Sequence, residues 1–200
     1  MKKIITWGVA LLATVALSVV LFKHSLTSGL SGMQVSNGDW ATSLETGSAD
    51  AGILLKASIA IGGLLASTRE NSIYYRLHTV NGEPLRIDCQ YRIEGNGYDA
   101  DWWSITAYGH DHYLIPNSEK RYSFNNENIR RRDDGSWVIH LAAIKQSGNW
   151  LPVGPSGSPK SRKSVDNDFD LLLRLYVPGD AYLETPQSAP VPKVTLENCA

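Results

Sequence analysis

The sequence predicts a mainly β protein: an antiparallel β-sandwich or jelly-roll-like domain with one packed N-terminal amphipathic helix, preceded by a transmembrane helix. Three observations predict this fold class. Polar and apolar residues alternate in short segments from residue 73 onward, as in half-buried strands. Turn signals such as NGEP, EGNG and RDDGS separate these segments. A long uncharged apolar run lies close to the N-terminus.

The apolar run covers residues 4–22, IITWGVALLATVALSVVLF. As a helix it would measure roughly 28 Å, close to the hydrocarbon thickness of a bilayer. Lys23 and His24 follow it in place of a small-x-small cleavage site, so we expect an uncleaved transmembrane anchor, with a cleaved signal peptide as the alternative. Lys2 and Lys3 favour a cytoplasmic N-terminus for residues 1–3. The chain would then cross the cytoplasmic (inner) membrane once and place its C-terminal domain in the periplasm or another extracytoplasmic space.

The remaining chain divides into a polar linker at residues 23–47 and one exported domain at residues 48–200. Within the domain, residues 49–67 (ADAGILLKASIAIGGLLAS) carry apolar residues at helical spacing, and Asp50 is placed to cap a helix. We therefore expect an amphipathic helix packed on the domain. Its predicted buried face consists of Leu54, Ala57, Ile61, Leu64 and Leu65.

The clearest strand pattern is LRIDCQYRI, residues 85–93, in which every second residue from Leu85 to Ile93 is apolar. Arginine, aspartate and glutamine fill the alternate positions, which indicates an antiparallel strand with one buried face. Cys89 is expected to point into the core. Further strands are predicted at residues 73–80, 102–108, 112–115, 136–142 and 170–177.

Cys89 and Cys199 are the two cysteines of the chain. Two cysteines in an exported domain can pair, so the sequence predicts a disulfide between them. The alternative is two thiols, one buried as a small apolar residue and one on a frayed tail.

The segment HDH, residues 110–112, raises the question of a metal site. A His-x-His pair is a legitimate start for zinc binding, provided that a third ligand and usually a fourth are near. Gly109 and Asp111, however, are typical of a hairpin turn between two strands. We expect a turn, with His110 and His112 as weak metal candidates. No cofactor is predicted, and the sequence indicates no catalytic residue.

Aromatic residues offer a binding hypothesis. Six tryptophans and nine tyrosines stand against three phenylalanines, which favours rings with a polar group. An exposed ring could stack on a saccharide or an apolar ligand, and we expect any ligand site near Trp102, Tyr108, Arg121 and Trp150. The alternative is that the tryptophans fill the core and that the arginine bonds to backbone carbonyls.

The charge balance limits the partners. With 19 basic and 20 acidic residues the formal net charge is -1, so nothing attracts nucleic acid. The expected partners are the membrane, through the N-terminal helix, and an envelope protein, a glycan or a small-molecule ligand.

Four segments in order carry a family resemblance: WWSITAY (102–108), LIPNSEKRYSF (114–124), GNWLP (148–152) and LLLRLYVP (171–178). Over about residues 70–195 the chain resembles a bacterial family called domain of unknown function 1214. The family is similar to β-sandwiches and has no established activity to transfer. In many relatives the domain follows a domain of unknown function 1254, so this chain looks like a short, membrane-anchored form without that partner.

From these observations we expect an envelope protein with a binding or accessory role. The alternative is an envelope enzyme, or a subunit of one, that acts on a small molecule or a glycan.

Overall fold

The computed structural model describes residues 2–28, 34–61, 64–154 and 167–199. Within them, two sheets pack face to face: a six-stranded sheet with strand order β1-β2-β3-β11-β7-β8 and a four-stranded sheet with order β10-β9-β6-β12. All neighbouring strands are antiparallel except the parallel pair β9 and β10. The predicted mainly β, sandwich-like fold is therefore confirmed.

The six-stranded sheet consists of β1 (Val35–Asn37), β2 (Trp40–Thr42), β3 (Ser72–Leu77), β7 (Ala100–Gly109), β8 (Ser123–Asn125) and β11 (Phe169–Pro178). The four-stranded sheet consists of β6 (Cys89–Gly95), β9 (Trp137–Ala142), β10 (Asn149–Pro152) and β12 (Lys193–Cys199). A small hairpin joins β4 (Thr79–Val80) to β5 (Glu83–Pro84), and the helices are α1 (Lys2–Ser28), α2 (Ile53–Ile61) and α3 (Asp180–Glu184).

The two central strands of the larger sheet show why the chain folds into a sandwich. Leu173 of β11 faces Ile105 of β7 across the ladder, and Leu175 faces Trp103. All four side chains are buried, because successive side chains of a strand point to opposite faces and these positions share the inner one. The positions between them, such as Arg174 and Thr106, point away from the core.

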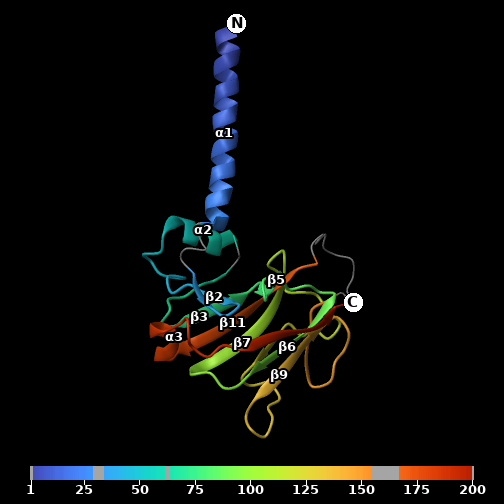
Figure 1. Ribbon diagram of the computed structural model, residues 1–200. Coiled ribbons are helices and arrows are strands. Elements are labelled where there is room, and N and C mark those ends of the chain that lie inside the picture. The colour runs from blue at the N-terminus through green and yellow to red at the C-terminus, as the bar shows by residue number, and fades with distance from the viewer. Residues whose placement is uncertain (1, 29–33, 62–63, 155–166, 200) are drawn as a thin grey trace.

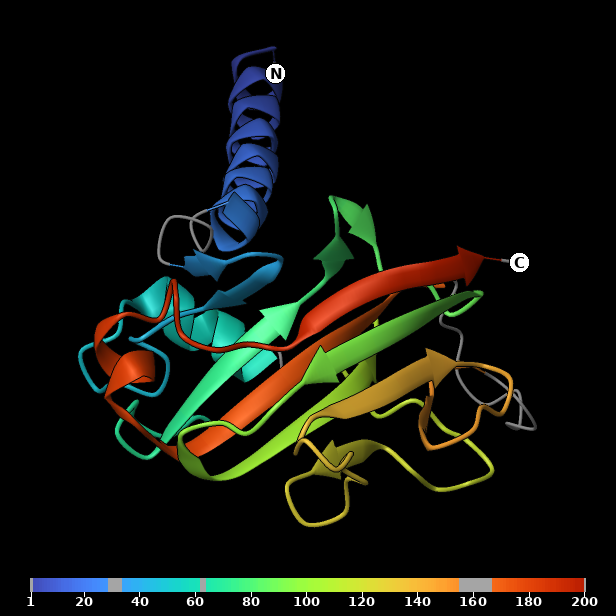
Figure 2. The same ribbon diagram turned by 60° about the horizontal axis from the view of Figure 1, so that its bottom comes forward.

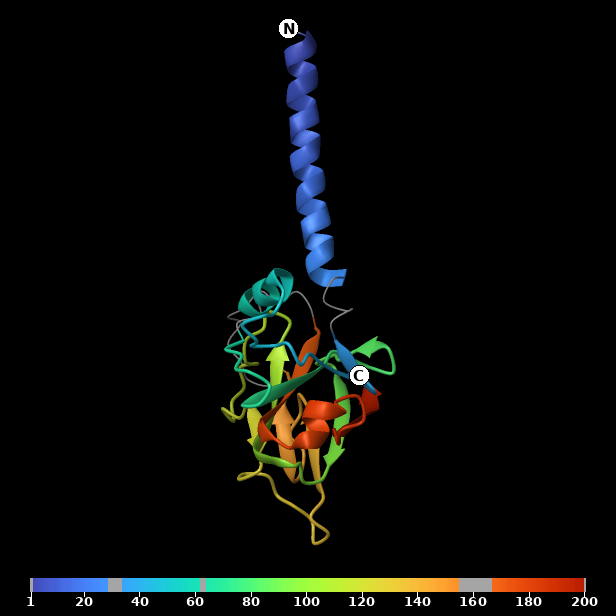
Figure 3. The same ribbon diagram turned by 90° about the vertical axis from the view of Figure 1, so that its left-hand side faces the viewer.

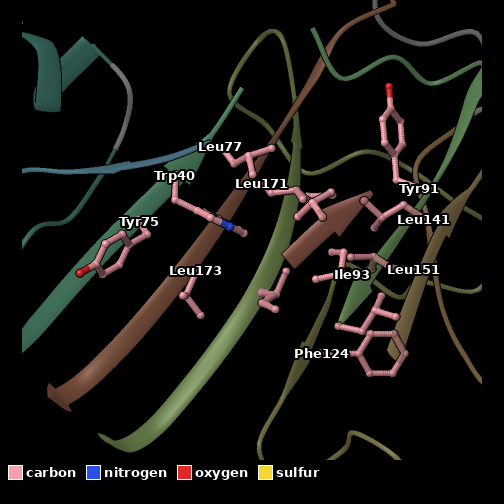
Figure 4. Packing of buried hydrophobic residues seen from close by; sticks show 14 of the residues in the cluster. Trp40, Tyr75, Leu77, Tyr91, Ile93, Phe124, Leu141, Leu151, Leu171 and Leu173 are labelled. Carbon is pink, nitrogen blue, oxygen red and sulfur yellow. The ribbon is translucent and has the colours of Figure 1, made fainter. Parts of the chain in front are cut away.

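The core fills the space between the sheets (Figure 4). Leu171 and Leu173 of the larger sheet meet Ile93 and Leu141 of the smaller sheet there. The rings of Trp103 and Trp137 stack across the two sheets, with their centroids 5.1 Å apart. The apolar area that these residues remove from water is the main stabilising contribution to the fold.

The N-terminal segment forms the single helix α1, which stands away from the sheets (Figures 1 and 3). No helix among the described residues has both the length and the apolar character that a membrane crossing requires. The transmembrane helix predicted for residues 4–22 is therefore not supported, whereas the helix itself is present.

Helix α2 is shorter than the predicted helix at 49–67. It ends at Ile61, so Leu65 lies outside the helix, and its side chain is 97% exposed instead of buried. Leu55 provides the buried contact of α2. Gly62 and Gly63 lie outside the described residues. The helix lies beside the C-terminal end of α1, at one end of the sandwich (Figures 1 and 3).

The predicted linker at 23–47 is largely structured. Its first residues belong to α1, residues 29–33 lie outside the described part of the chain, and residues 35–42 form β1 and β2. Trp40 explains this order, because its ring is buried in the core and its indole N–H donates to the Pro192 carbonyl at 2.8 Å. A buried aromatic ring ties this segment to the sandwich.

Two further expectations about strands need correction. Residues 112–115 form no strand; only an isolated bridge joins Leu114 to Tyr108. No strand was predicted for residues 149–152 or 193–199, yet they form β10 and β12. In both strands the alternation is weak, because β10 is buried at every position and β12 is mostly exposed.

Cys89 and Cys199 are directly opposite each other on β6 and β12 and form the predicted disulfide. Figure 2 shows β12, which ends near the C-terminus, beside β6. Cys89 is buried, as its place in the alternation predicts. The bond therefore fixes the edge strand of the smaller sheet, at the end of the chain, to its neighbour.

Candidate functional site

The outer face of the six-stranded sheet carries polar side chains from its neighbouring strands β3, β11 and β7. Register pairs place Arg76 beside Leu172 and Tyr74 beside Arg174, on the face opposite the core. Two arginines on adjacent strands thus share this face. Because the side chains on the inner face pack in the core, the outer face is where the sandwich can expose polar groups to a ligand.

Arg174 is held rigidly on this face. Its guanidinium donates to Thr106 Oγ1 at 3.0 Å and to the Tyr108 hydroxyl at 2.5 Å, and it lies 5.4 Å from the centre of the Tyr108 ring. Next to them, Asp170 pairs with His78, whose Nδ1 lies 2.5 Å from a carboxylate oxygen. Arg174 and Asp170 are therefore both bonded to neighbouring side chains of this face.

A pocket of about 100 Å³ lies between this face and α2. Tyr74, Arg76 and Leu172 form the sheet side, and Leu55, Ser58 and Ile59 of α2 form the opposite side. The remaining lining residues are Gln34, Ala41, Thr42, Ser43, Thr46 and Leu64. The pocket combines apolar side chains with hydroxyls, and in the part of the chain that the structure describes Arg76 is its one charged lining residue.

Several polar groups of this pocket have no protein partner. Thr42 Oγ1 and Ser43 Oγ are buried without a hydrogen bond to any described residue. No hydrogen bond or ion pair joins the Arg76 guanidinium to the described part of the chain either. The two hydroxyl oxygens have almost no accessible surface, whereas the Arg76 side chain is partly accessible and can bond to water or to a ligand.

The four residues predicted to bind a ligand are not brought together. Trp102 and Tyr108 share the outer face of β7, but their positions differ by six, or about 20 Å along a strand. The ring of Trp102 packs edge-on against Tyr176, with centroids 5.4 Å apart. Tyr108 is bonded to Arg174, as described above. None of these residues lines the pocket beneath α2.

Arg121 and Trp150 form a separate contact. Arg121 Nη1 donates to the Trp150 carbonyl at 3.1 Å, and the guanidinium lies 5.5 Å from the centre of the Phe124 ring. Trp150 is 3% exposed, and its indole N–H donates to the Ala142 carbonyl at 2.9 Å. The structural alternatives stated for these two residues, a core tryptophan and an arginine bonded to a backbone carbonyl, are therefore the ones observed.

The HDH segment forms a turn, as predicted. The Gly109 N–H donates to the Tyr113 carbonyl and the His112 N–H donates to the Gly109 carbonyl, both at 2.9 Å. His112 has a φ of 62°, and Asp111 accepts a bond from the Tyr113 N–H. His110 and His112 are both exposed. In the described part of the chain, no three histidine, cysteine, aspartate or glutamate side chains gather in a way that could hold a metal ion.

Sequence reasoning missed the pocket residues Arg76, Thr42 and Ser43. One signal was present: Arg76 is the one charged residue of the strand SIYYRL, at a position that points away from the core. Thr42 and Ser43 carried no such signal, because they were assigned to a linker.

A comparison with protein families shows which family the chain belongs to. The family described as "Protein of unknown function (DUF1214)" matches residues 70–180 of this chain. The chain belongs to the DUF1214 family. Arg76, Tyr108 and Arg174 lie within the matched region, whereas Thr42, Ser43 and α2 precede it. The comparison does not extend to the expected short, membrane-anchored form or to a domain of unknown function 1254.

Two solved structures are similar to this DUF1214 chain. The VPA0106 protein from Vibrio parahaemolyticus is 20% identical with a TM-score of 0.58, over 74% of this chain and 36% of that protein. An uncharacterised protein from Burkholderia cenocepacia is 17% identical with a TM-score of 0.38, over 67% of this chain and 31% of that protein. The first similarity supports the fold alone. The chain spans about a third of the length of these two proteins, and no curated protein matches it.

Proposed function

We propose that this DUF1214 protein is a cell-envelope protein that is held at a membrane by α1 and binds a small molecule in the pocket beneath α2. The observation that carries the binding role is a pocket in which Arg76, without a partner among the described residues, lines the same space as apolar side chains of α2. A ligand that enters this space can gain a charged hydrogen bond and apolar contacts together.

The exposed side chains of α1 support membrane attachment. Trp7, Leu12 and Leu17 are 75%, 72% and 59% exposed, and other apolar residues of the helix are similarly open. Apolar surface gains roughly 25 cal/mol for each Å² removed from water, and a large exposed apolar patch is typical of a membrane or protein contact.

The disulfide supports an extracytoplasmic position for the sandwich. Cys89 and Cys199 are bonded, and such bonds persist in oxidising compartments such as the periplasm. Together with α1, this favours attachment to the cytoplasmic membrane with the sandwich on its outer side.

The chemistry of the pocket favours binding over catalysis. Its polar lining consists of hydroxyls, one amide and one guanidinium, without a histidine or a carboxylate. General acid–base catalysis near neutral pH usually requires groups of the latter kinds. His140 does lie 4.0 Å from Glu197, but neither residue lines this pocket. We therefore rank the binding role above the envelope enzyme acting on a small molecule or a glycan.

Two measurements on the full-length protein test the proposal. Cell fractionation should place the chain in the membrane fraction, and a non-permeant label should reach the sandwich from outside the cytoplasmic membrane. Recovery of the chain as a cytosolic protein would remove the envelope role.

Native mass spectrometry of the detergent-solubilised protein should reveal a bound small molecule. Ser58→Phe places a ring in the pocket and should abolish this signal. Ile53→Phe introduces the same ring on the same helix at a site that is 82% exposed, and it should retain the signal. An unliganded wild-type protein, or a signal that survives Ser58→Phe, would contradict binding in this pocket.

A further inference from the structure

We infer that the ligand of this pocket is a small monocarboxylate with a short apolar chain, and that the Arg76 guanidinium holds its carboxylate group. This inference rests on the proposed function and specifies its ligand class. Three observations support it: the charge of the pocket, the absence of a hydrogen bond from Arg76 to the described residues, and the size and lining of the pocket.

The charge of the pocket selects an anion. Arg76 is the only charged residue among the described residues that line it. Asp170, the nearby carboxylate on the same sheet face, is paired with His78 and is not one of the lining residues. An anionic group that enters the pocket therefore meets one positive charge and no opposing negative charge, in a partly buried space where Coulomb interactions are stronger than in water.

Arg76 differs from two other partly buried arginines. Arg121 bonds to the Trp150 carbonyl, and Arg174 bonds to Thr106 and Tyr108. The Arg76 side chain has no such bond within the described residues, although it is only partly accessible. A guanidinium presents donors in a planar fork, which a carboxylate accepts through two parallel bonds. The available fork of Arg76 thus fits a carboxylate.

The Tyr74 hydroxyl, which also belongs to a lining residue of the pocket, is suited to the same group. Tyr74 accepts a bond from Ser72 Oγ at 2.7 Å, which leaves its own hydrogen for another acceptor. The Tyr74 hydroxyl lies 3.5 Å from the Leu65 carbonyl, at the outer limit of a hydrogen bond, so a ligand oxygen can compete for it.

The size and the lining define the rest of the ligand. A volume of about 100 Å³ has room for only a few heavy atoms. Leu55, Ile59 and Leu172 provide apolar contacts, which suit a short alkyl chain and disfavour a second charged group. A phosphate carries more charge than the single available guanidinium balances. These features together favour a short-chain monocarboxylate.

Titration of the full-length protein in detergent with butyrate tests the inference, with butan-1-ol and inorganic phosphate as comparison probes. We expect saturable butyrate binding, followed by isothermal calorimetry, and no comparable binding of the alcohol or of phosphate. Arg76→Ala should weaken butyrate binding by about 10- to 100-fold, the range for a lost charged hydrogen-bonded pair. Arg92→Ala removes the same charge from the other sheet and should change the affinity less than twofold.

Arg76→Lys serves as a second variant, because it keeps the charge and removes the planar fork; it should bind butyrate with intermediate affinity. Near-UV circular dichroism establishes that each variant is folded. Equal binding of butyrate to wild type and folded Arg76→Ala, or preferred binding of phosphate, would overturn the carboxylate inference.

The two proposals fail differently. A neutral molecule found in the wild-type protein and lost from Ser58→Phe would refute the carboxylate and preserve binding in the pocket. An empty wild-type pocket that also does not take up butyrate would refute both.

Discussion

The disulfide between Cys89 and Cys199 makes the most quantitative prediction. It closes a loop with a sequence separation of 110 residues, between the edge strand β12 and its neighbour β6. Removing the bond lets the unfolded chain regain the entropy that the closed loop denies it. For a loop of this length, the chain-entropy relation gives about 5 kcal/mol of stabilisation at 25 °C. That amount is a large fraction of the 5–15 kcal/mol by which domains are typically stable.

Cys199→Ser is the informative variant, because Cys199 is exposed and its replacement changes no packing, whereas Cys89 is buried. We expect the melting temperature of the full-length protein in detergent to fall by about 10–20 °C, on the basis of roughly 2–4 °C for each kcal/mol in a chain of this size. Near-UV circular dichroism, which reports the packed tryptophans, follows the transition.

A reducing agent provides the matched control. Reduction should lower the melting temperature of the wild-type protein to that of Cys199→Ser and should leave the variant unchanged. An alkylating reagent should label neither cysteine of the wild-type protein before reduction. If the two proteins melt at the same temperature without reductant, the bond does not constrain the unfolded chain, and the entropic argument is wrong.

Three further predictions concern the core, the buried tyrosines and the HDH turn. Leu173→Ala, at a fully buried position of β11, should lower the free energy of unfolding by about 2–5 kcal/mol. Ile144→Ala, at a residue that is 70% exposed, should change it by less than about 0.5 kcal/mol. Denaturant titration measures both free energies, and equal losses would contradict the burial of Leu173. Burial raises the pKa of Tyr75 and Tyr182, so their contribution to stability is complete below the ordinary tyrosine pKa of about 10 and is lost as the pH rises above it. The denaturant concentration at the unfolding midpoint should therefore decrease as the pH rises above 10, and it should decrease less steeply in Tyr75→Phe. Tyrosinate absorbance of the folded protein should appear at a higher pH than that of the unfolded chain. A midpoint that does not change with pH in this range would contradict the burial. Excess Zn²⁺ should leave the melting temperature unchanged, because His110 and His112 lie in an exposed turn, and a rise that depends on both histidines would reveal a metal site.

Alternation predicted the strands that contribute one face to the core. Residues 85–93 and 170–177 show it plainly, and most of their apolar positions are buried in the structure. The exceptions are Ile87, which is partly buried in a turn before β6 begins at Cys89, and Val177, which is 55% exposed near the end of β11. The pattern was weaker where a strand is buried on both faces or on neither. Asn149–Pro152 is buried throughout and pairs parallel to β9, so its sequence resembled a loop with one tryptophan.

Helical spacing overestimated α2 for a related reason. Apolar residues continue past Ile61, but spacing alone does not show where backbone hydrogen bonding stops. Leu65 fits the helical pattern of the sequence and is nevertheless solvent-exposed beyond the helix end. Apolar periodicity thus identified the element and not its boundary.

The ligand prediction relied on residue type, and the structure does not gather its four residues at one place. Tryptophan and arginine can bind ligands, but Trp150 and Arg121 satisfy their polar groups with backbone carbonyls, as most buried polar groups do. The pocket beneath α2 depends instead on groups that lack such partners. This property arises only when β2, β3 and α2 come together in space, and it is not encoded in any local motif.

The pocket also joins two parts of the chain with different relationships to the family. Arg76 and Leu172 lie in the region that matches DUF1214, whereas Thr42, Leu55 and Ser58 precede it. The family region thus contributes the sheet and its guanidinium, and the preceding segment contributes the cover. If a carboxylate binds Arg76, a change in the preceding segment would alter the space available to the rest of the ligand and leave the charged contact in place. Ligand selectivity in this arrangement is therefore determined mainly by α2 and the residues after β2, and anion binding by β3.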